Sequence, residues 1–414
     1  MIDNITDLVS AMPDMLSQNE LISAMAVLPE YDENIISSNN TVRLLALTEL
    51  YKIYIPSKMS SEIYEKLYIA LMRSLQKKGT KIAIRQQNEN YKAIHQQEYE
   101  GIIGGSDSFT IIGISGIGKS SAISRAISLI TNDMIIIVDK PFVKIIPCVI
   151  VQCPFDSSVK GLLLEILRKV DEHIETKYYD SALRSRSTTD MLIGSVSQVA
   201  LNHIGMLIVD EIQNVVNSKN GKSLVGMLTQ LINNSGISIC MVGTPESTIF
   251  FEQAMQLARR SVGLQYGALP YDSYFEEVCK LLLSYRYVRY PTEISPSLIN
   301  WLFEHSRGII AILISIIHDA QEIAILNASE SLNIITLDEA YKKRLTLMHG
   351  FLHKESVKCT QPAKKRSAWN VPVSNTTPSD NQISILEIVQ KAKNENLDII
   401  ELMKIHNLIE EVAI

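Results

Sequence analysis

The residues best suited to chemistry lie in the stretch GISGIGKS, residues 113–120. Gly113, Gly118, Lys119 and Ser120 match G-x-x-x-x-G-K-[ST], in which the glycines let backbone N–H groups face a phosphate chain. The lysine reaches the β- and γ-phosphates in such a loop, and the serine hydroxyl binds Mg²⁺. The stretch therefore predicts a site for a nucleoside triphosphate. Its expected contacts are Gly113, Ser115, Gly116, Ile117, Gly118, Lys119, Ser120 and Ser121.

A second motif, MLIVDEIQN, contains two acidic residues and follows at residues 206–214. Four apolar residues end in Asp210 and Glu211, and the carboxyl ends of parallel strands meet at one edge of a sheet. Beside the phosphate loop, Asp210 is expected to hold the Mg²⁺ shell, and Glu211 to orient and polarise an attacking water. An isolated pair of acids at a strand end is also common as a solvated turn, which is the alternative.

Four further residues are weaker candidates for the same catalytic site. Thr244 ends the apolar strand ISICMVGT and is placed to sense the γ-phosphate. The alternative is that Thr244 is only a turn residue at the end of the strand. Arg259 and Arg260, in QLARRSVG, suit an arginine finger that reaches a neighbouring subunit, or a solvated helix face. Arg307, in EHSRGIIAIL, is a candidate for a contact to the γ-phosphate within the same chain.

The elements that must position these residues alternate between short apolar strands and helical patterns from residue 109 to about 270. This rhythm is typical of an α/β fold with a parallel sheet and helices on both faces. The flanking sequence is helical on both sides, and a stretch rich in Ser, Thr, Asn, Pro and Lys precedes the C-terminal end. The expected organisation is a helical N-terminal segment (1–100), a nucleotide-binding core (101–270), a helical lid (271–352), a flexible linker (353–380) and an amphipathic helical tail (381–414).

The composition excludes several classes of protein. The chain has 414 residues, 46% of them apolar, and a net charge of −6, so nucleic-acid binding must come from a local patch. The five cysteines form no C-x-x-C pair, which argues against a disulfide scaffold. Neither a signal peptide nor a run of about 18 apolar residues is present, so we expect a cytoplasmic protein without a membrane partner.

The motifs together resemble an AAA+ ATPase, and within that superfamily they are similar to the TnsC/TniB transposition regulators. The residues that carry the resemblance are, in order, GISGIGKSS, LIVDEIQN, MVGTPES, QLARRSVG and SRGIIAILISIIHDAQ. It extends over about residues 25–350 and includes the lead-in segment AVLPEYDENIISSNNTVRLLALTELYKIYIP. The lid has SRG where a clear G-x-x-R is typical, which leaves the role of Arg307 open.

The resemblance implies how the chemistry is used. Proteins of this family hydrolyse ATP with Mg²⁺ and assemble as rings or helical filaments on duplex DNA without strong sequence preference. They pass a signal from a target-site selector to transposase subunits, and hydrolysis resets the complex. The alternative is a signalling ATPase of the STAND or replication-initiator kind, which switches protein partners without using a DNA channel.

Two basic stretches between the phosphate loop and the acidic strand are candidates for the DNA contacts. They are SSVKGLLLEILRK and SALRSRSTTD, in the region where AAA+ rings place pore elements. A filament needs few cations in each protomer, because each protomer repeats them along the phosphates. Exposed basic loops without a ligand are the alternative. The candidate residues are Lys160, Arg184, Arg186, Thr188 and Thr189.

The tail has one apolar face, formed by residues such as Ile385, Ile388 and Val389. An amphipathic helix outside the core must bury that face somewhere. The two alternatives are docking onto a transposase subunit and packing against the chain's own lid.

Overall fold

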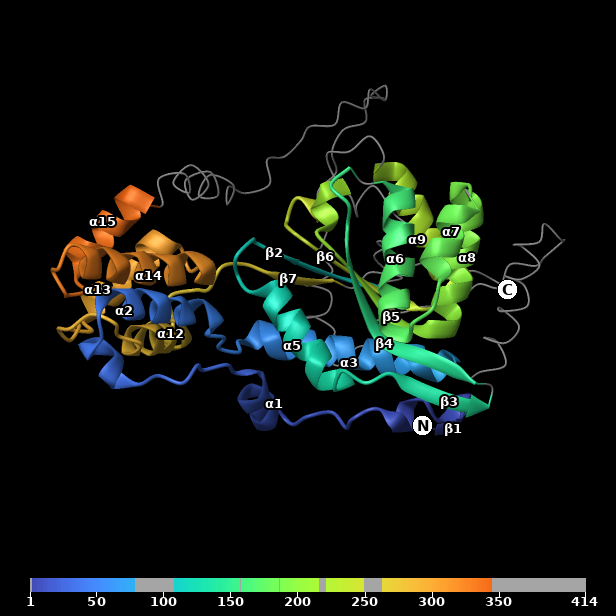
Figure 1. Ribbon diagram of the computed structural model, residues 1–414, viewed down its shortest axis with the longest axis horizontal. Helices are drawn as coiled ribbons and strands as arrows, with labels where there is room; N and C mark the ends of the chain where they lie inside the picture. The colour runs from blue at the N-terminus through green and yellow to red at the C-terminus, as the bar shows by residue number, and fades with distance from the viewer. Residues whose placement is uncertain are drawn as a thin grey trace, which may run out of the picture. The chain divides into compact units, whose positions relative to one another are not determined.

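Seven strands form one sheet at the centre of the described chain (Figure 1), in the order β1-β3-β4-β5-β6-β2-β7. The computed structural model describes residues 2–78, 108–140, 142–156, 158–185, 187–215, 221–248 and 263–344. The strands are β1 (Ile2–Asn4), β2 (Phe109–Gly113), β3 (Ile136–Lys140), β4 (Val143–Gln152), β5 (Ile204–Asp210), β6 (Ser238–Gly243) and β7 (Leu264–Tyr266).

The sheet is mixed rather than wholly parallel. Parallel ladders join β4 to β5, β5 to β6, β6 to β2 and β2 to β7, as the sequence predicts. One pair departs from the expected parallel arrangement, because β3 runs antiparallel to β4. Only two residues, 141 and 142, separate these strands in the sequence. A connection this short suits a hairpin, whereas a parallel pair needs a crossover of a dozen or more residues. Strand β1 adds to the outer edge, parallel to β3.

Helices cover both faces of the sheet. Along β5, Met206 and Ile208 face one hydrophobic core, whereas Leu207 and Val209 face the other, as the two-residue period of a strand requires. Figure 1 shows α6, α8 and α9 on one side, while α3 and α5 lie on the other. These helices are α3 (Lys58–Lys78), α5 (Lys119–Thr131), α6 (Val159–Ile174), α8 (Thr189–His203) and α9 (Gly221–Ser235).

A third hydrophobic core lies in the helical region after β7, and part of the N-terminal segment completes it. Leu47 and Leu50 are fully buried there against the lid, whereas Leu21 and Met25 of α1 are buried in a core of the sheet. The N-terminal segment is therefore shared between sheet and lid. The remaining elements are η1 (Ile5–Asp7), η2 (Val9–Ala11), α1 (Gln18–Met25), η3 (Glu33–Ser37), α2 (Asn40–Leu47), η4 (Thr48–Lys52), α7 (Tyr178–Arg184), η5 (Ile212–Val215), α12 (Ser273–Ser284), α13 (Pro296–Ser306), α14 (Ile310–Leu326) and α15 (Ile334–Arg344).

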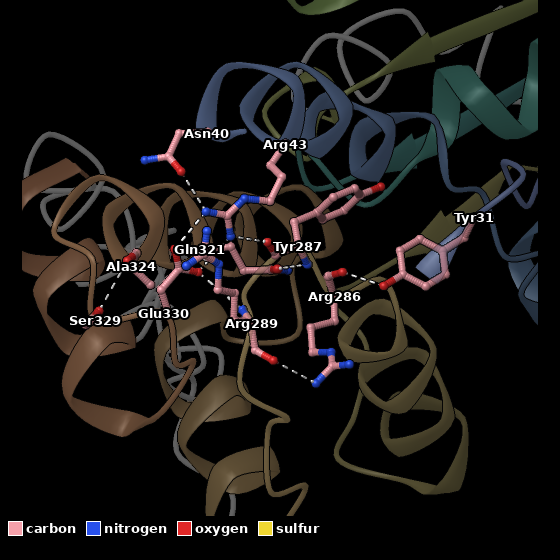
Figure 2. Close-up of polar contacts among 10 residues, drawn as sticks. All are labelled: Tyr31, Asn40, Arg43, Arg286, Tyr287, Arg289, Gln321, Ala324, Ser329 and Glu330. Carbon is pink, nitrogen blue, oxygen red and sulfur yellow. Dashed lines mark hydrogen bonds and ion pairs between the residues drawn. The ribbon is translucent and has the colours of Figure 1, made fainter. Parts of the chain in front are cut away.

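A buried ion pair fastens α2 to the lid (Figure 2). The Arg43 side chain is fully buried, and its two terminal nitrogens donate to the two carboxylate oxygens of Glu330, each at 2.7 Å. The same nitrogens also donate to the Tyr287 carbonyl at 3.0 Å and to the Asn40 side chain at 2.8 Å. We call Asn40, Arg43, Tyr287 and Glu330 the lid clamp. It joins residues 244 and 287 positions apart in the sequence.

No single helix within the described ranges is long and apolar enough to cross a membrane; α13 and α14 pass that test only as a pair, with a bend of 119° between them.

Candidate functional site

The phosphate loop lies between the end of β2 and the start of α5. Gly116 and Gly118 adopt left-handed conformations, with φ of 83° and 95°, which side chains with a Cβ rarely adopt. A Cβ at Gly113 would lie 2.8 Å from Ile117 Cδ1 and 2.9 Å from the Tyr266 carbonyl oxygen. Two of the three glycines are thus needed for the turn, and the third for close packing beneath it.

Lys119 opens α5, and its amine lies inside the loop. Its Nζ donates to the carbonyl oxygens of Gly113 at 2.6 Å and Ile114 at 2.9 Å. Burial lowers the pKa of Lys119, while the nearby charges of Asp210 and Glu211 act to raise it. The amine is therefore held by replaceable backbone acceptors beside two carboxylates, an arrangement in which it can turn to a phosphate.

The hydroxyl of Ser120 and the carboxylate of Asp210 meet across the sheet, although they are 90 residues apart. Ser120 Oγ donates to Asp210 Oδ2 at 3.1 Å. Hydroxyl and carboxylate oxygens are the ligands that Mg²⁺ prefers, and it keeps several waters of its own. The donor set therefore suits Mg²⁺ bound with phosphates.

Glu211 follows Asp210 in a left-handed conformation, with φ of 57°, and its side chain is exposed. Its backbone N–H donates to Asp210 Oδ1 at 2.8 Å. Its carboxylate accepts a hydrogen bond from Gln213 Nε2, and Gln213 Oε1 in turn accepts the Thr244 backbone N–H at 3.3 Å. Gln213 thus joins two predicted catalytic residues. Sequence reasoning missed it, although it lies within the acidic motif.

The lid contacts the phosphate loop directly. The Ala311 backbone N–H, in the first turn of α14, donates to the Gly116 carbonyl at 3.0 Å. A Cβ at Gly116 would lie 3.0 Å from Ile309 Cγ2 and 3.1 Å from Ala311 Cβ. The backbone of the phosphate loop is therefore in direct contact with the start of α14.

A cavity of about 990 Å³ opens in front of the loop and the acidic strand end. This volume is typical of a site for a small molecule or cofactor. Polar groups of the predicted site line one part of it, and apolar side chains from residues 53–55, the lid and the preceding loop line another. The apolar lining includes Ile53, Ile55, Leu269, Val278, Leu282 and Ile314. Sequence reasoning did not assign residues 51–62 to the site, although YKIYIPSKMS is rich in tyrosine and isoleucine beside a helix start.

The structure brings together most of the predicted nucleotide site but not all of it. Ser115, Gly116, Ile117, Gly118, Lys119, Ser120, Ser121, Asp210, Glu211 and Thr244 all line the cavity. Arg307 does not: it ends α13 in a left-handed conformation, with φ of 54°, and is exposed outside the cavity lining. Its contact to a phosphate stays a prediction. Arg259 and Arg260 lie outside the described residues, as does the tail.

The predicted DNA-binding residues that the structure describes lie at the start of α6, the end of α7 and the start of α8. Lys160, near the start of α6, donates to the Ser187 carbonyl at 3.5 Å, so this helix start and the loop before α8 are adjacent. Thr188 caps α8, because its hydroxyl accepts the Met191 N–H. Arg184 and Thr189 are exposed near it, and Arg186 lies outside the described residues.

Comparisons with known proteins agree with the sequence motifs. The family model described as "Bacterial TniB protein" matches residues 95–265, under half of the chain. No curated protein shows significant sequence similarity to the chain.

Several solved structures share parts of the architecture at low identity. The Aeropyrum pernix ORC1 protein in complex with DNA is 12% identical over 63% of this chain and 64% of that one, with a TM-score of 0.40. This chain thus spans less than two thirds of that ORC1 chain. Drosophila ORC bound to DNA is 11% identical over 98% of this chain and 86% of that one, with a TM-score of 0.44. Domain III of the Thermotoga maritima replication initiation protein DnaA is 12% identical over 63% of this chain and 91% of that one, with a TM-score of 0.36.

The fold class expected from the sequence is confirmed: a largely parallel α/β sheet, with the phosphate loop after β2 and the acidic pair after β5. The family match lies on the segment that carries both motifs. Through residues 95–265 the chain is similar to the bacterial TniB family, which confirms the resemblance found in its sequence.

Proposed function

We propose that this chain is an ATP-dependent regulator of transposition. It assembles on duplex target DNA as a ring or filament, connects a target-site selector to the transposase, and is reset by ATP hydrolysis. The observation that carries the proposal is the meeting of Lys119, Ser120, Asp210 and Glu211 at one cavity. The similarity of this segment to TniB supports the role in transposition.

Each group of the site has a role in the proposed hydrolysis. The loop N–H groups and Lys119 bind the triphosphate, while Ser120 and Asp210 hold Mg²⁺, which neutralises phosphate charge when bound. The carboxylate of Glu211 orients a water and accepts its proton as the water oxygen bonds to the γ-phosphorus, while the bond from that phosphorus to the β–γ bridging oxygen breaks and ADP leaves. Thr244 lies at the end of the neighbouring strand, suitable for sensing the γ-phosphate. The apolar side of the cavity receives the adenine ring.

The proposed DNA contacts rest on exposed residues at the start of α6, the end of α7 and the start of α8. Lys160 and Arg184 supply positive charge, and Thr188 and Thr189 supply hydroxyls near a helix N-terminus, which favours anions. Contacts of this kind are made to phosphates and do not distinguish one base sequence from another. An assembly that repeats them along a duplex binds without strong sequence preference, and its affinity falls as salt rises.

The substitution Glu211→Gln tests the catalytic part of the proposal. We expect unchanged ATP binding by calorimetry, hydrolysis reduced about 100-fold or more, and long-lived complexes with DNA. Glu277→Gln, an exposed glutamate of α12, is the matched control and should leave turnover unchanged. Ordinary turnover in Glu211→Gln would show that another group directs the water.

Electron microscopy with an unhydrolysable ATP analogue tests the assembly. Filaments or rings that require duplex DNA support the transposition regulator. Assemblies that are indifferent to DNA favour a signalling or initiator ATPase that switches protein partners. Lys119→Ala should abolish nucleotide-dependent assembly in either case.

A further inference from the structure

We propose that Gln213 is a positioning residue that links Thr244 to the catalytic carboxylate of Glu211; this inference rests on the proposed ATP hydrolysis. Gln213 lies in η5, the short helix that follows the acidic strand end. Its side chain turns back towards both neighbouring strand ends, β5 and β6. One amide group thereby contacts the base and the γ-phosphate sensor at once.

The chemistry of the amide matches both partners. Nε2 donates to Glu211, an acceptor, and Oε1 accepts from the Thr244 N–H, a donor. These two partners fix which end of the amide is nitrogen and which is oxygen. Glutamate at 213 would accept from Thr244 but repel Glu211. Methionine would fill similar space and make neither bond.

The backbone around Glu211 explains why its side chain needs such a partner. Glu211 is exposed and left-handed, a conformation that costs a residue with a Cβ about 1–2 kcal/mol. Its main chain is held by Asp210 Oδ1 on one side and by the Asn214 N–H on the other, at 2.8 and 3.0 Å. Among the hydrogen bonds of the described chain, the one that fixes the Glu211 carboxylate comes from Gln213.

Close packing holds Gln213 beside β6. A Cβ at Gly243 would lie 3.2 Å from Gln213 Oε1 and 2.7 Å from Ile212 Cγ2. The glycine therefore leaves room for the amide against the strand end. A shift of the Thr244 backbone on contact with a γ-phosphate would pull on Oε1, and the same rigid amide would move Nε2 and with it the Glu211 carboxylate.

The test compares full-length Gln213→Met and Gln213→Glu with the unmodified chain. We expect Gln213→Met to lower kcat about 10- to 100-fold while ATP affinity, by calorimetry, changes less than about twofold. Gln213→Glu keeps the acceptor for the Thr244 N–H but places a second carboxylate against Glu211. It should likewise lower kcat while leaving ATP affinity nearly unchanged, a separation that general loss of packing does not produce. Gln230→Met, an exposed glutamine of α9, is the control and should be normal.

A double variant asks whether Gln213 acts through Glu211. In a Glu211→Gln background, Gln213→Met should change the residual rate less than about twofold, because the carboxylate it positions is already gone. Normal turnover of Gln213→Met, or effects that multiply in the double variant, would overturn the inference and leave the ATPase proposal intact. An unmodified chain that binds no ATP with Mg²⁺, or does not hydrolyse it, would overturn both.

Discussion

The phosphate loop and the lid clamp each hold a cation, partly buried in the loop and fully buried in the clamp, and its hydrogen-bond partners differ between the two. Lys119 donates to two carbonyls of its own loop and faces an open cavity. Arg43 is fully buried and donates to four acceptor atoms, including both oxygens of Glu330. Hydrogen bonds from Arg43 lower the pKa of Glu330, so the carboxylate stays charged in the pair.

The difference shows that Lys119 is available to bind a ligand, whereas Arg43 stabilises the fold. The partners of Lys119 can be replaced by phosphate oxygens. Three of the four acceptor atoms around Arg43, on Tyr287 and Glu330, come from distant segments that meet only in the folded chain. Removing Arg43 leaves the buried Glu330 with only the exposed Arg289, 3.8 Å away, as a charged partner, and this should cost more than losing a surface pair.

The largest expected effect is at the lid clamp. Arg43→Met should lower the free energy of unfolding by about 3–5 kcal/mol, because the buried Glu330 loses both short charged hydrogen bonds and keeps only the exposed Arg289, 3.8 Å away, as a cation partner. Urea denaturation of the full chain measures it. Arg168→Met is the matched control: Arg168 pairs with Glu165 and Glu172 on the surface of α6, so the loss should stay below about 1 kcal/mol. Equal losses in both variants would contradict the comparison.

The double variant Arg43→Met with Glu330→Met sharpens this result. Replacing both charges removes the buried carboxylate that Arg43→Met leaves weakly paired, so the double variant should be more stable than Arg43→Met alone. A double variant that is less stable than either single variant would show that the clamp contributes through the geometry of its hydrogen bonds.

The second effect is at the phosphate loop. Lys119→Ala should weaken ATP binding by about 3 kcal/mol, or roughly 100-fold, since a charge-assisted hydrogen bond to phosphate is lost. Its unfolding free energy should change little. Calorimetry and urea denaturation of the same material measure the two quantities. Lys140→Ala, an exposed lysine at the end of β3, is the control. Loss of stability without loss of affinity would reverse the roles assigned to loop and clamp.

The smallest effect, measured per pH unit, concerns Lys78, which is buried. It donates to the carbonyls of Ala200 and Leu201 near the end of α8, and burial lowers its pKa to about 7. Between pH 7 and its ordinary value near 10.5, the unfolded chain holds a proton that the folded chain lacks. Stability should therefore rise with pH, by at most about 1.4 kcal/mol per unit, relative to Lys78→Met. Parallel pH curves for the two proteins would contradict this.

Residues close together in the sequence were the easiest to predict. The eight residues 113–120 fix their own turn through glycines, so the loop and the direction of Lys119 follow from local chemistry. Asp210 and Glu211 were found because a buried strand must carry them to the sheet edge. Gln213 was not found, because its contact with Thr244 depends on the register of β5 and β6 and on the space above Gly243. The antiparallel pairing of β3 with β4 was not predicted, although the two residues between these strands, 141 and 142, are too few for the crossover that a parallel pair needs.

By itself the sequence determined the phosphate loop, the acidic strand end and the largely parallel α/β sheet, because each depends on the local geometry of glycine turns and on strand periodicity. Only the tertiary structure decided that α2 joins the lid through Arg43 and Glu330, that residues 51–62 line the cavity, and that Arg307 lies outside it. These are pairings between segments up to 287 residues apart. They are set by which apolar faces pack together, and no local propensity encodes that choice.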